Sequence, residues 1–248
     1  MVNIRLLRDR TLAVSTIAIS LAFAAFFASV VLIPLWMQEI VGYTATEAGY
    51  AMAYQGMLAV LIAPLAAFLL NRVDPRLTIS AGVLWLGFAT LLRMRWSTEA
   101  DHWLLIYPQL LQGLGMPFFF IGLTSLSLAN MKPDQIASAA GLMTFARTMS
   151  GAIATAMATT LWTSNARTQR VELVSVLNDP AGAIATMQKG GMSTEQARAM
   201  LDRMVEAQAS TNSALHVFAL SVIMFVGAAA VVWLAPRPRR ALDPGASH

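Results

Sequence analysis

The sequence has no cysteine among its 248 residues, which excludes disulfide bonds, thiolate catalysis and cysteine-ligated metals. Charged residues are also scarce, at 12%, against about 25% in an average soluble domain. None of the three histidines has another ligand at helical spacing, so neither a metal nor another cofactor is predicted. Hydrophobic residues make up 57% of the chain, and this balance favours a lipid bilayer over water as the solvent.

Long apolar stretches recur along the chain, near the about 20 residues that a helix needs to cross about 30 Å of hydrocarbon. Hydropathy places six of them at about 11–36, 45–70, 77–95, 103–128, 136–163 and 212–235. The first is expected to be retained, because its apolar part exceeds the about 7–15 residues of a signal-peptide core. The predicted fold class is an all-α membrane protein, a single membrane domain over 1–248 whose six transmembrane helices form two three-helix repeats.

The net charge of +4 and the pI near 10 come from basic residues at the ends of the apolar stretches rather than from one basic patch. No nucleic-acid partner is therefore predicted. The basic residues of the termini and of the connections near 72 and 132 fall on one side, which the positive-inside rule makes cytoplasmic. Both termini, including the tail 236–248, are expected on that side, and Arg93 is assigned to a connection on the other.

The connection between the last two stretches, 164–211, is much longer than the others and is predicted to be an extracytoplasmic loop. Within it, residues of about 193–208 follow the 3.6-residue period, and Ser193 with Gln196 has the pattern of a capping box. This amphipathic helix is expected either to lie on the membrane surface and the span ends or to dock an extracytoplasmic partner.

Polar and helix-bending residues cluster in the stretch 103–128. Gln109 and Gln112 lie one helical turn apart, and buried amides without partners cost several kcal/mol, about 2–7, so both are predicted to point into the bundle. Gly113, Gly115 and Pro117 follow directly. Two interpretations stay open for them: bending that suits rocking motions, or close packing while the glutamines bond to neighbours.

Arg147 is the one charge inside 136–163, a stretch whose rows of small residues predict close packing against other helices. Its side chain is expected either to snorkel toward water or to face the bundle interior and pair with an anionic group. Tyr54 and Gln55, near mid-depth of 45–70, are candidates for substrate contact or for interhelical bonds. Of the phenylalanines at 118–120, only one or two can face inward, and Phe119 is the candidate.

Acidic residues are missing from the depth of every predicted span, since Glu47 is at an edge and Asp101 is in a connection. A proton relay through a membrane generally needs an intramembrane carboxylate or histidine. The chain alone is therefore expected to lack a proton carrier. It also shows no nucleophile–base pair or phosphate loop, so an enzyme is not predicted.

The stretches 42–76 and 107–162 and the end "VVWLAPRP" make the chain similar to the C-terminal half of EmrB/QacA-type multidrug efflux proteins, fourteen-span members of the major facilitator superfamily, with the EmrB branch closest. The cytoplasmic family motif G-x-L-A-D-R-x-G-R-R has a degenerate copy at 67–76, where Arg72 and Arg76 match but Ala67, Asn71 and Asp74 replace its glycine, aspartate and second glycine. The resemblance therefore implies a gating role for the two arginines alone. The motif R-x-x-Q-G-x-G is echoed at 109–115 with Gln109 in place of its arginine.

The resemblance implies one six-span bundle of a proton-motive-force-driven exporter of lipophilic drugs in the bacterial inner membrane, working by alternating access. It implies three protein partners: the N-terminal bundle, a periplasmic adaptor and an outer-membrane channel. The chain would then be a fragment or half of a split transporter. The alternative is a non-transporting scaffold or inactive half that recruits an extracytoplasmic partner. The predicted substrate cavity is built from Tyr54, Gln55, Gln109, Gln112, Phe119 and Arg147.

Overall fold

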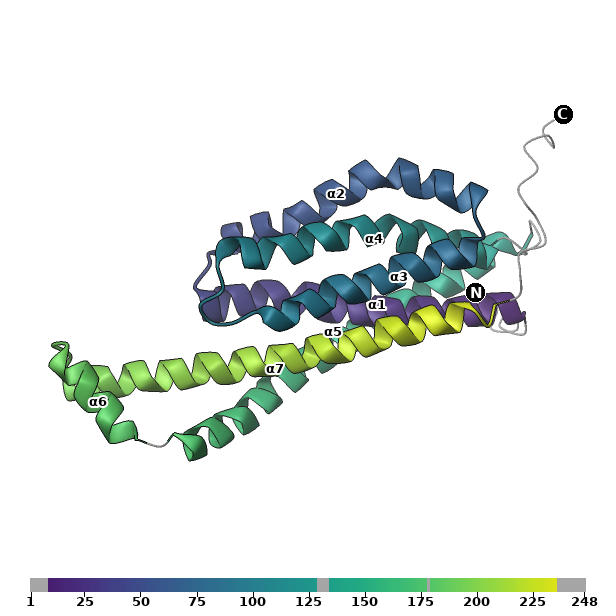
Figure 1. Ribbon diagram of the computed structural model, residues 1–248. Helices are drawn as coiled ribbons and strands as arrows, with labels where there is room; N and C mark the ends of the chain where they lie inside the picture. The colour runs from purple at the N-terminus through teal and green to yellow at the C-terminus, as the bar shows by residue number, and fades with distance from the viewer. Residues whose placement is uncertain (1–8, 129–133, 178, 236–248) are drawn as a thin grey trace.

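The computed structural model describes residues 9–128, 134–177 and 179–235, and in these ranges all the regular structure is helical. Figure 1 shows the helices in chain order. The α-helices are α1 Arg10–Trp36, α2 Ala45–Arg72, α3 Pro75–Leu92, α4 His102–Leu128, α5 Ile136–Val176, α6 Pro180–Lys189 and α7 Thr194–Val232. Two short turns extend the first and the third of these: the π-helical turn η2 Met37–Val41 follows α1, and the 3₁₀ turn η3 Arg93–Arg95 follows α3.

Polar side chains fix where these helices begin. Asp9 accepts a hydrogen bond from the Leu12 amide, 2.9 Å away, at the start of α1. Thr44 and Glu47 form a capping box at the start of α2. The α3 helix begins with the cap residue Asp74 followed by a proline, whose missing amide hydrogen costs nothing in the first turn. These caps satisfy the amides that the helical ladder leaves free.

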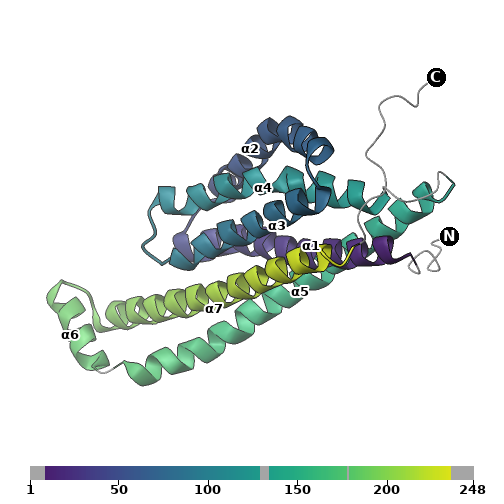
Figure 2. The same ribbon diagram turned by 45° about the vertical axis from the view of Figure 1, so that its right-hand side comes forward.

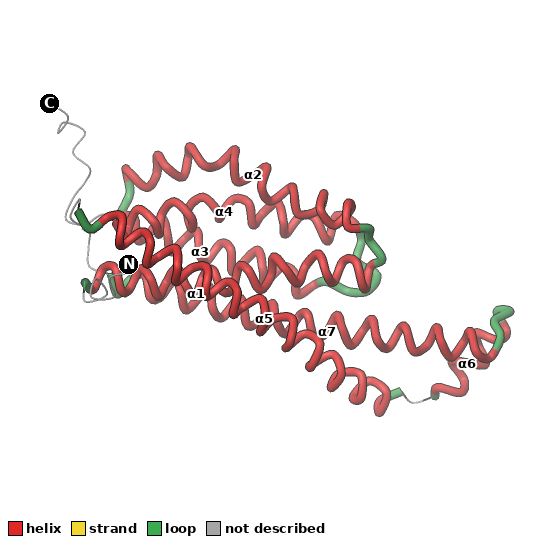
Figure 3. Tube along the Cα trace, turned by 180° about the vertical axis from the view of Figure 1, so that it is seen from behind, coloured by secondary structure: helices red, strands yellow, loops and turns green. Residues whose placement is uncertain are grey.

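The helices run nearly side by side in one bundle. The α2 helix lies along α4, α3 lies between α4 and α7, and α1 packs against both α5 and α7. In Figure 1 and in the rotated view of Figure 2, α2 is an outer helix on the α4 side, whereas α5 lies on the α1 and α7 side. The view from behind in Figure 3 shows α5 crossing the bundle obliquely. The two outer helices, α2 and α5, therefore bracket α1 and α4.

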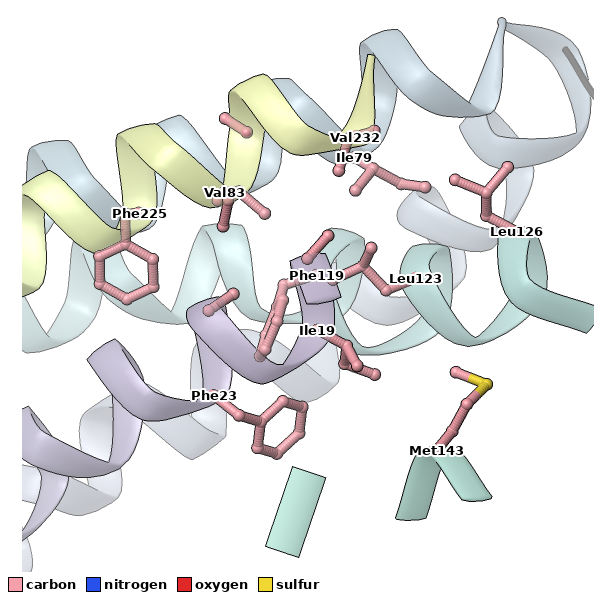
Figure 4. Close-up of a cluster of buried hydrophobic side chains, with 14 of the residues drawn as sticks. Ile19, Phe23, Ile79, Val83, Phe119, Leu123, Leu126, Met143, Phe225 and Val232 are labelled. Carbon is pink, nitrogen blue, oxygen red and sulfur yellow. The ribbon is translucent and has the colours of Figure 1, made fainter. Parts of the chain in front are cut away.

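Two buried clusters hold the bundle together. The larger joins α1, α3, α4, α5 and α7, and Figure 4 shows Ile19, Phe23, Val83, Phe119 and Phe225 among its members. Burial of such side chains contributes roughly 1.5–3 kcal/mol each.

The second cluster closes the end of the bundle where α1 ends and α4 begins. Trp36 stacks on Trp96 with ring centroids 5.1 Å apart, and its indole nitrogen donates to Thr211 of α7 at 3.1 Å. Trp162 of α5 donates to the Ser210 carbonyl at 2.9 Å. Indole rings thus fasten α1, α5 and α7 at this level while satisfying their own N–H groups.

The predicted connection 164–211 is mostly helical, and its extracytoplasmic placement stays a prediction. The α5 helix continues to Val176, and the predicted amphipathic helix is the first part of the 39-residue helix α7, capped by Ser193 and Gln196 as expected. Figure 1 shows α5 and α7 extending beyond the other helices, with α6 across the tip. Polar residues in this region indicated a loop, but two long helices can pair outside a bilayer as well as inside it.

We name this projection, residues 164–211, the outer hairpin. A salt bridge joins its two arms. Arg170 on α5 pairs with Asp202 and with Glu206 on α7, at 3.3 Å from the latter. These carboxylates raise the pKa of Arg170 above its ordinary value, chiefly through the hydrogen bond to Asp202. Because both arms are exposed, the pair orients the hairpin more than it stabilises it.

Five helical segments are long and apolar enough to cross a membrane: Arg10–Val41, Ala45–Arg72, Pro75–Arg95, His102–Ser127 and Thr194–Val232. The α5 helix is 41 residues long but is outside this set, since threonines, serines and Arg147 interrupt its apolar residues. A sixth span over 136–163 and the pairing into two repeats stay predictions.

Candidate functional site

The side chain of Arg147 lies where α1, α4 and α5 meet. It is half-buried, and its guanidinium carbon is 5.0 Å from the centre of the Phe23 ring. Within the part of the chain that the structure describes, no carboxylate lies within ion-pairing distance of it. A cation over an aromatic face is stabilised by about 0.5–2 kcal/mol without losing its free N–H donors. Arg147 is thus held in place but remains available to an anionic group.

A small niche opens beside this guanidinium, with a volume of about 60 Å³. Thr124 of α4 and Thr144 of α5 contribute hydroxyl groups, and Ile19 and Met143 contribute apolar walls. Figure 4 shows Ile19, Phe23 and Met143 around this junction. The niche combines a cation, hydroxyls and apolar surface, which is the composition expected of a site for one end of an amphiphilic molecule.

Phe119 lies inside the core rather than on an accessible wall. It is fully buried, and its ring centroid is 4.9 Å from that of Phe23. Phe120 is only partly buried and meets Phe23 edge-on at 5.1 Å. Of the two, Phe120 is the more accessible at the junction, and Phe119 supports the ring on which Arg147 rests.

Tyr54 and Gln55 are carried by α2, away from Arg147. Tyr54 is half-buried, and Gln55 is buried with its amide nitrogen 3.1 Å from the sulfur of Met116 on α4. Within the described part of the chain, the side-chain oxygen of Gln55 has no hydrogen-bond partner. Because α2 packs on α4 and α5 packs on α1, the structure does not bring these two residues into contact with Arg147.

Gln109 and Gln112 are fully buried around a residue that the sequence placed elsewhere, Arg93. The guanidinium of Arg93 donates to the side-chain oxygens of Gln109, at 2.8 Å, and of Gln112. It also donates to the Thr90 hydroxyl at 3.3 Å and lies 5.9 Å from the centre of the Phe218 ring. The two glutamines do share a face and do point into the bundle, but they meet Arg93 and not Arg147.

The assignment of Arg93 to an exposed connection was therefore wrong. Arg93 begins the 3₁₀ turn that extends α3, so its side chain is still directed by the helix and reaches α4. Hydropathy ends a span at the first cluster of charges and cannot separate a buried arginine from its exposed neighbour Arg95. The available signal was on α4, where two amides one turn apart required a polar partner.

The glycines of α4 make close approaches to neighbouring helices. A Cβ atom at Gly113 would lie 2.5 Å from the Gln55 carbonyl oxygen of α2, and one at Gly115 would lie 2.9 Å from the Gly82 carbonyl oxygen of α3. The α4 helix continues without interruption through Pro117. These glycines have the close-packing role, and a bending role for Gly113, Gly115 and Pro117 stays a prediction.

Comparison with known proteins identifies the family. Residues 5–168 match the family model described as the Major Facilitator Superfamily. This chain belongs to the major facilitator superfamily. The multidrug export protein EmrB of Escherichia coli K12 is 30% identical over 242 residues, which are 96% of this chain and 47% of that protein. The fatty acid resistance protein FarB of Neisseria gonorrhoeae is 30% identical over 241 residues, 96% of this chain and 48% of that protein.

A third relative, the probable multidrug resistance protein EmrY of Escherichia coli K12, is 27% identical over 98% of this chain and 48% of its own length. The chain thus spans about half the length of these relatives. The predicted similarity to the C-terminal half of EmrB-type transporters is confirmed. As a member of this superfamily the chain is a multi-pass membrane protein and not an enzyme.

The two arginines of the degenerate superfamily motif lie at the connection between α2 and α3. Arg72 is exposed, with its guanidinium carbon 5.1 Å from the centre of the Phe68 ring. Arg76 is only 8% exposed, and its Nε and one terminal nitrogen have no hydrogen-bond partner among the residues that the structure describes. Asp74 between them caps α3 by accepting from the Arg76 amide at 3.0 Å. The gating role of both arginines stays a prediction.

Proposed function

We propose that this chain is the C-terminal bundle of a multidrug efflux transporter that exports lipophilic compounds from the bacterial cytoplasm. The observation that carries the proposal is the similarity of 96% of the chain to the export protein EmrB. Proteins named for multidrug export and fatty acid resistance are among its relatives, and this favours transport over a scaffold without transport activity.

The outer helices α2 and α5 supply a face for a second bundle. Large apolar side chains lie uncovered on both, with Val60 of α2 74% exposed and Ile153 of α5 53% exposed. Between them lie α1 and α4, which pack only lightly against each other. A partner bundle that covers α2 and α5 would leave the α1, α4 and α5 junction facing an enclosed space, and the N-terminal bundle is the partner that fits.

We expect the substrate to bind at Arg147. A lipophilic compound with an anionic or strongly polar group would place that group at Arg147, Thr124 and Thr144 and its apolar part along Phe23 and Phe120. Charge-assisted hydrogen bonds contribute about 1.5–3 kcal/mol each, enough to change affinity by at least tenfold. Tyr54 and Gln55 would line the same cavity from the α2 side.

Proton coupling would rest on the partner bundle. Among the described residues, the buried charged side chains are Arg76 and Arg93, neither of which is a carboxylate. A proton carrier that loads and unloads within the membrane has to come from elsewhere. Alternating access would then rock this bundle against the N-terminal one, with both of this chain's termini in the cytoplasm.

The outer hairpin would be the contact for a periplasmic adaptor and, through it, an outer-membrane channel. It extends past the bundle end, and apolar residues such as Val171 and Met204 are exposed on its arms. Apolar surface on an extramembrane projection is typical of a protein-binding face.

The test is efflux from cells that lack their own exporters and co-express this chain with an N-terminal half. We expect Arg147→Ala to lower export of an anionic lipophilic dye by about tenfold or more, and Arg147→Lys to retain part of it. Export of a neutral dye of the same skeleton should change less. Arg95→Ala is the matched control at an exposed arginine. Unchanged anionic export by Arg147→Ala at equal abundance rejects the site.

A further inference from the structure

The ring of Phe23 on α1 is enclosed by other phenylalanine rings. Its centroid is 4.9 Å from that of Phe119 and 5.1 Å from that of Phe120, both on α4. It is also 5.8 Å from the ring of Phe27, one turn further along α1. Figure 4 shows Phe23 and Phe119 close together in the core. Because only 3% of Phe23 is exposed and its neighbours are rigid rings, the Phe23 ring has little freedom to turn.

The guanidinium of Arg147 lies over this fixed ring, with its central carbon 5.0 Å from the ring centre. The face of an aromatic ring carries partial negative charge, so it attracts a cation there. Arg147 is on α5 and Phe23 is on α1, two helices that pack against each other. An arginine without such a contact can extend its long side chain toward water. The ring therefore favours one of the two orientations that the sequence leaves open for Arg147.

A second contact, one turn along both helices, fixes how closely α5 approaches α1 at this point. Gly151 follows Arg147 by four residues, and Phe27 follows Phe23 by four. A Cβ atom at Gly151 would lie 3.2 Å from the Phe27 ring, which is closer than an ordinary van der Waals contact. The absence of a side chain at Gly151 therefore allows the short distance between the helices at which Arg147 reaches Phe23.

The Phe23 ring lies next to the niche at Arg147 without lining it. Ile19, one turn before Phe23 on α1, forms part of the niche wall, and Arg147 forms another part. Phe23 is not a lining residue. Its effect on a bound compound would therefore be transmitted chiefly through the guanidinium that it holds.

We propose that Phe23 is a positioning residue that makes this site select anionic over neutral compounds, because its ring holds the Arg147 guanidinium at the niche. The inference rests on the proposed function, since it requires that Arg147 binds the anionic group of the substrate. A role of Phe23 in packing alone would change export of anionic and neutral compounds by the same factor. The ratio of the two export rates therefore distinguishes positioning from packing.

The experiment measures export of anthracenecarboxylate and of its neutral carboxamide by the full chain, co-expressed with an N-terminal half. Phe23→Leu keeps an apolar side chain but removes the aromatic face. We expect the ratio of carboxylate to carboxamide export to fall by about twofold to thirtyfold, the range that a cation–π contact can supply. Trifluorophenylalanine at position 23 keeps the ring but withdraws negative charge from its face, and it should give a smaller fall in the same direction.

Phe26 provides the matched control. Its ring belongs to the same cluster, 5.8 Å from that of Phe120, but among the described residues the ring in contact with Arg147 is that of Phe23. Phe26→Leu should therefore leave the ratio unchanged, even if it lowers the abundance of the protein. In an Arg147→Ala background, Phe23→Leu should have no further effect on the ratio, because the group that it positions is gone.

The outcomes separate the positioning role from the site itself. If Arg147→Ala lowers the ratio but neither change at Phe23 does, or if Phe26→Leu lowers it as much as Phe23→Leu, the positioning role is overturned and the Arg147 site stands. If Arg147→Ala leaves the ratio unchanged, both are overturned. Export rates are compared at equal abundance of each variant in the membrane.

Discussion

Two arginines place guanidinium groups among apolar helices in different ways. Arg93 is fully buried and donates through its two terminal nitrogens to Gln109, Gln112 and Thr90, while its Nε has no partner among the described residues, so it has a structural role between α3 and α4. Arg147 rests on the ring of Phe23, and within the ranges that the structure describes its guanidinium has no carboxylate partner. The first arginine fastens the bundle, and the second is the one available to a ligand.

Replacing the two glutamine partners of Arg93 should lower the free energy of unfolding more than replacing the glutamines and Arg93 together. In Gln109→Leu with Gln112→Leu, a buried charge loses its two amide oxygens, and we expect the free energy of unfolding to fall by about 3–5 kcal/mol. Adding Arg93→Met to that pair should recover most of the loss, because an apolar cluster carries no desolvation cost. Thermal unfolding of the three proteins in one detergent measures this. A triple variant less stable than the double variant would contradict the structural role.

At the scale of helices, contact between α2 and α4 depends on the absence of a side chain at Gly113. Gly113→Ala would bring a methyl group 2.5 Å from the Gln55 carbonyl oxygen and 3.0 Å from Leu58. Because backbone has to move, we expect a loss of about 1–3 kcal/mol of stability.

Gly56→Ala on α2 is the matched control, since nothing lies within 4 Å of a Cβ atom at that position. It should leave stability unchanged or raise it by up to about 1 kcal/mol through helix propensity. If both alanine variants melt at the same temperature in detergent, α2 and α4 are not in the close contact described.

Hydropathy predicted the positions of helices α1, α2, α3 and α4 within a few residues, because each is a nearly uninterrupted apolar stretch. The cap at the start of α7 was also predictable, because Ser193 and Gln196 are only three residues apart in the sequence. Which helices pack against each other could not be predicted from neighbouring residues. Nothing in the sequence around Arg93 indicates that it faces Gln109. The polarity after residue 163 did not mark the end of α5, which continues to Val176, so the length of this helix was not predicted.

The small residues of α5 illustrate the same limit. Gly151 is buried and approaches the Phe27 ring of α1, as a close-packing row predicts. The opposite side of α5 is uncovered, with Phe145 and Met157 exposed. The predicted close packing is therefore seen on one face of α5, because a row of small residues specifies one packed face and gives no information about the others.

At the scale of the whole molecule, α2 and α5 leave one side of the bundle open to a partner. A cysteine in place of Thr144 tests this, since the chain has no other cysteine and a thiol reacts as its thiolate, which forms in water and not in hydrocarbon. We expect a water-soluble maleimide to label Thr144→Cys strongly only when the N-terminal half is present and encloses a wet cavity. Ile223→Cys, on the exposed side of α7, should stay unlabelled in both cases.

Drug uptake into proteoliposomes under an imposed proton gradient tests whether this chain transports as one of two bundles, with this chain and an N-terminal half reconstituted separately and together. If the chain is one bundle of a two-bundle exporter, gradient-driven accumulation of a lipophilic drug requires both halves and collapses when an ionophore removes the gradient. Equal accumulation by this chain alone, or none from an assembled complex of the two halves, would contradict the account.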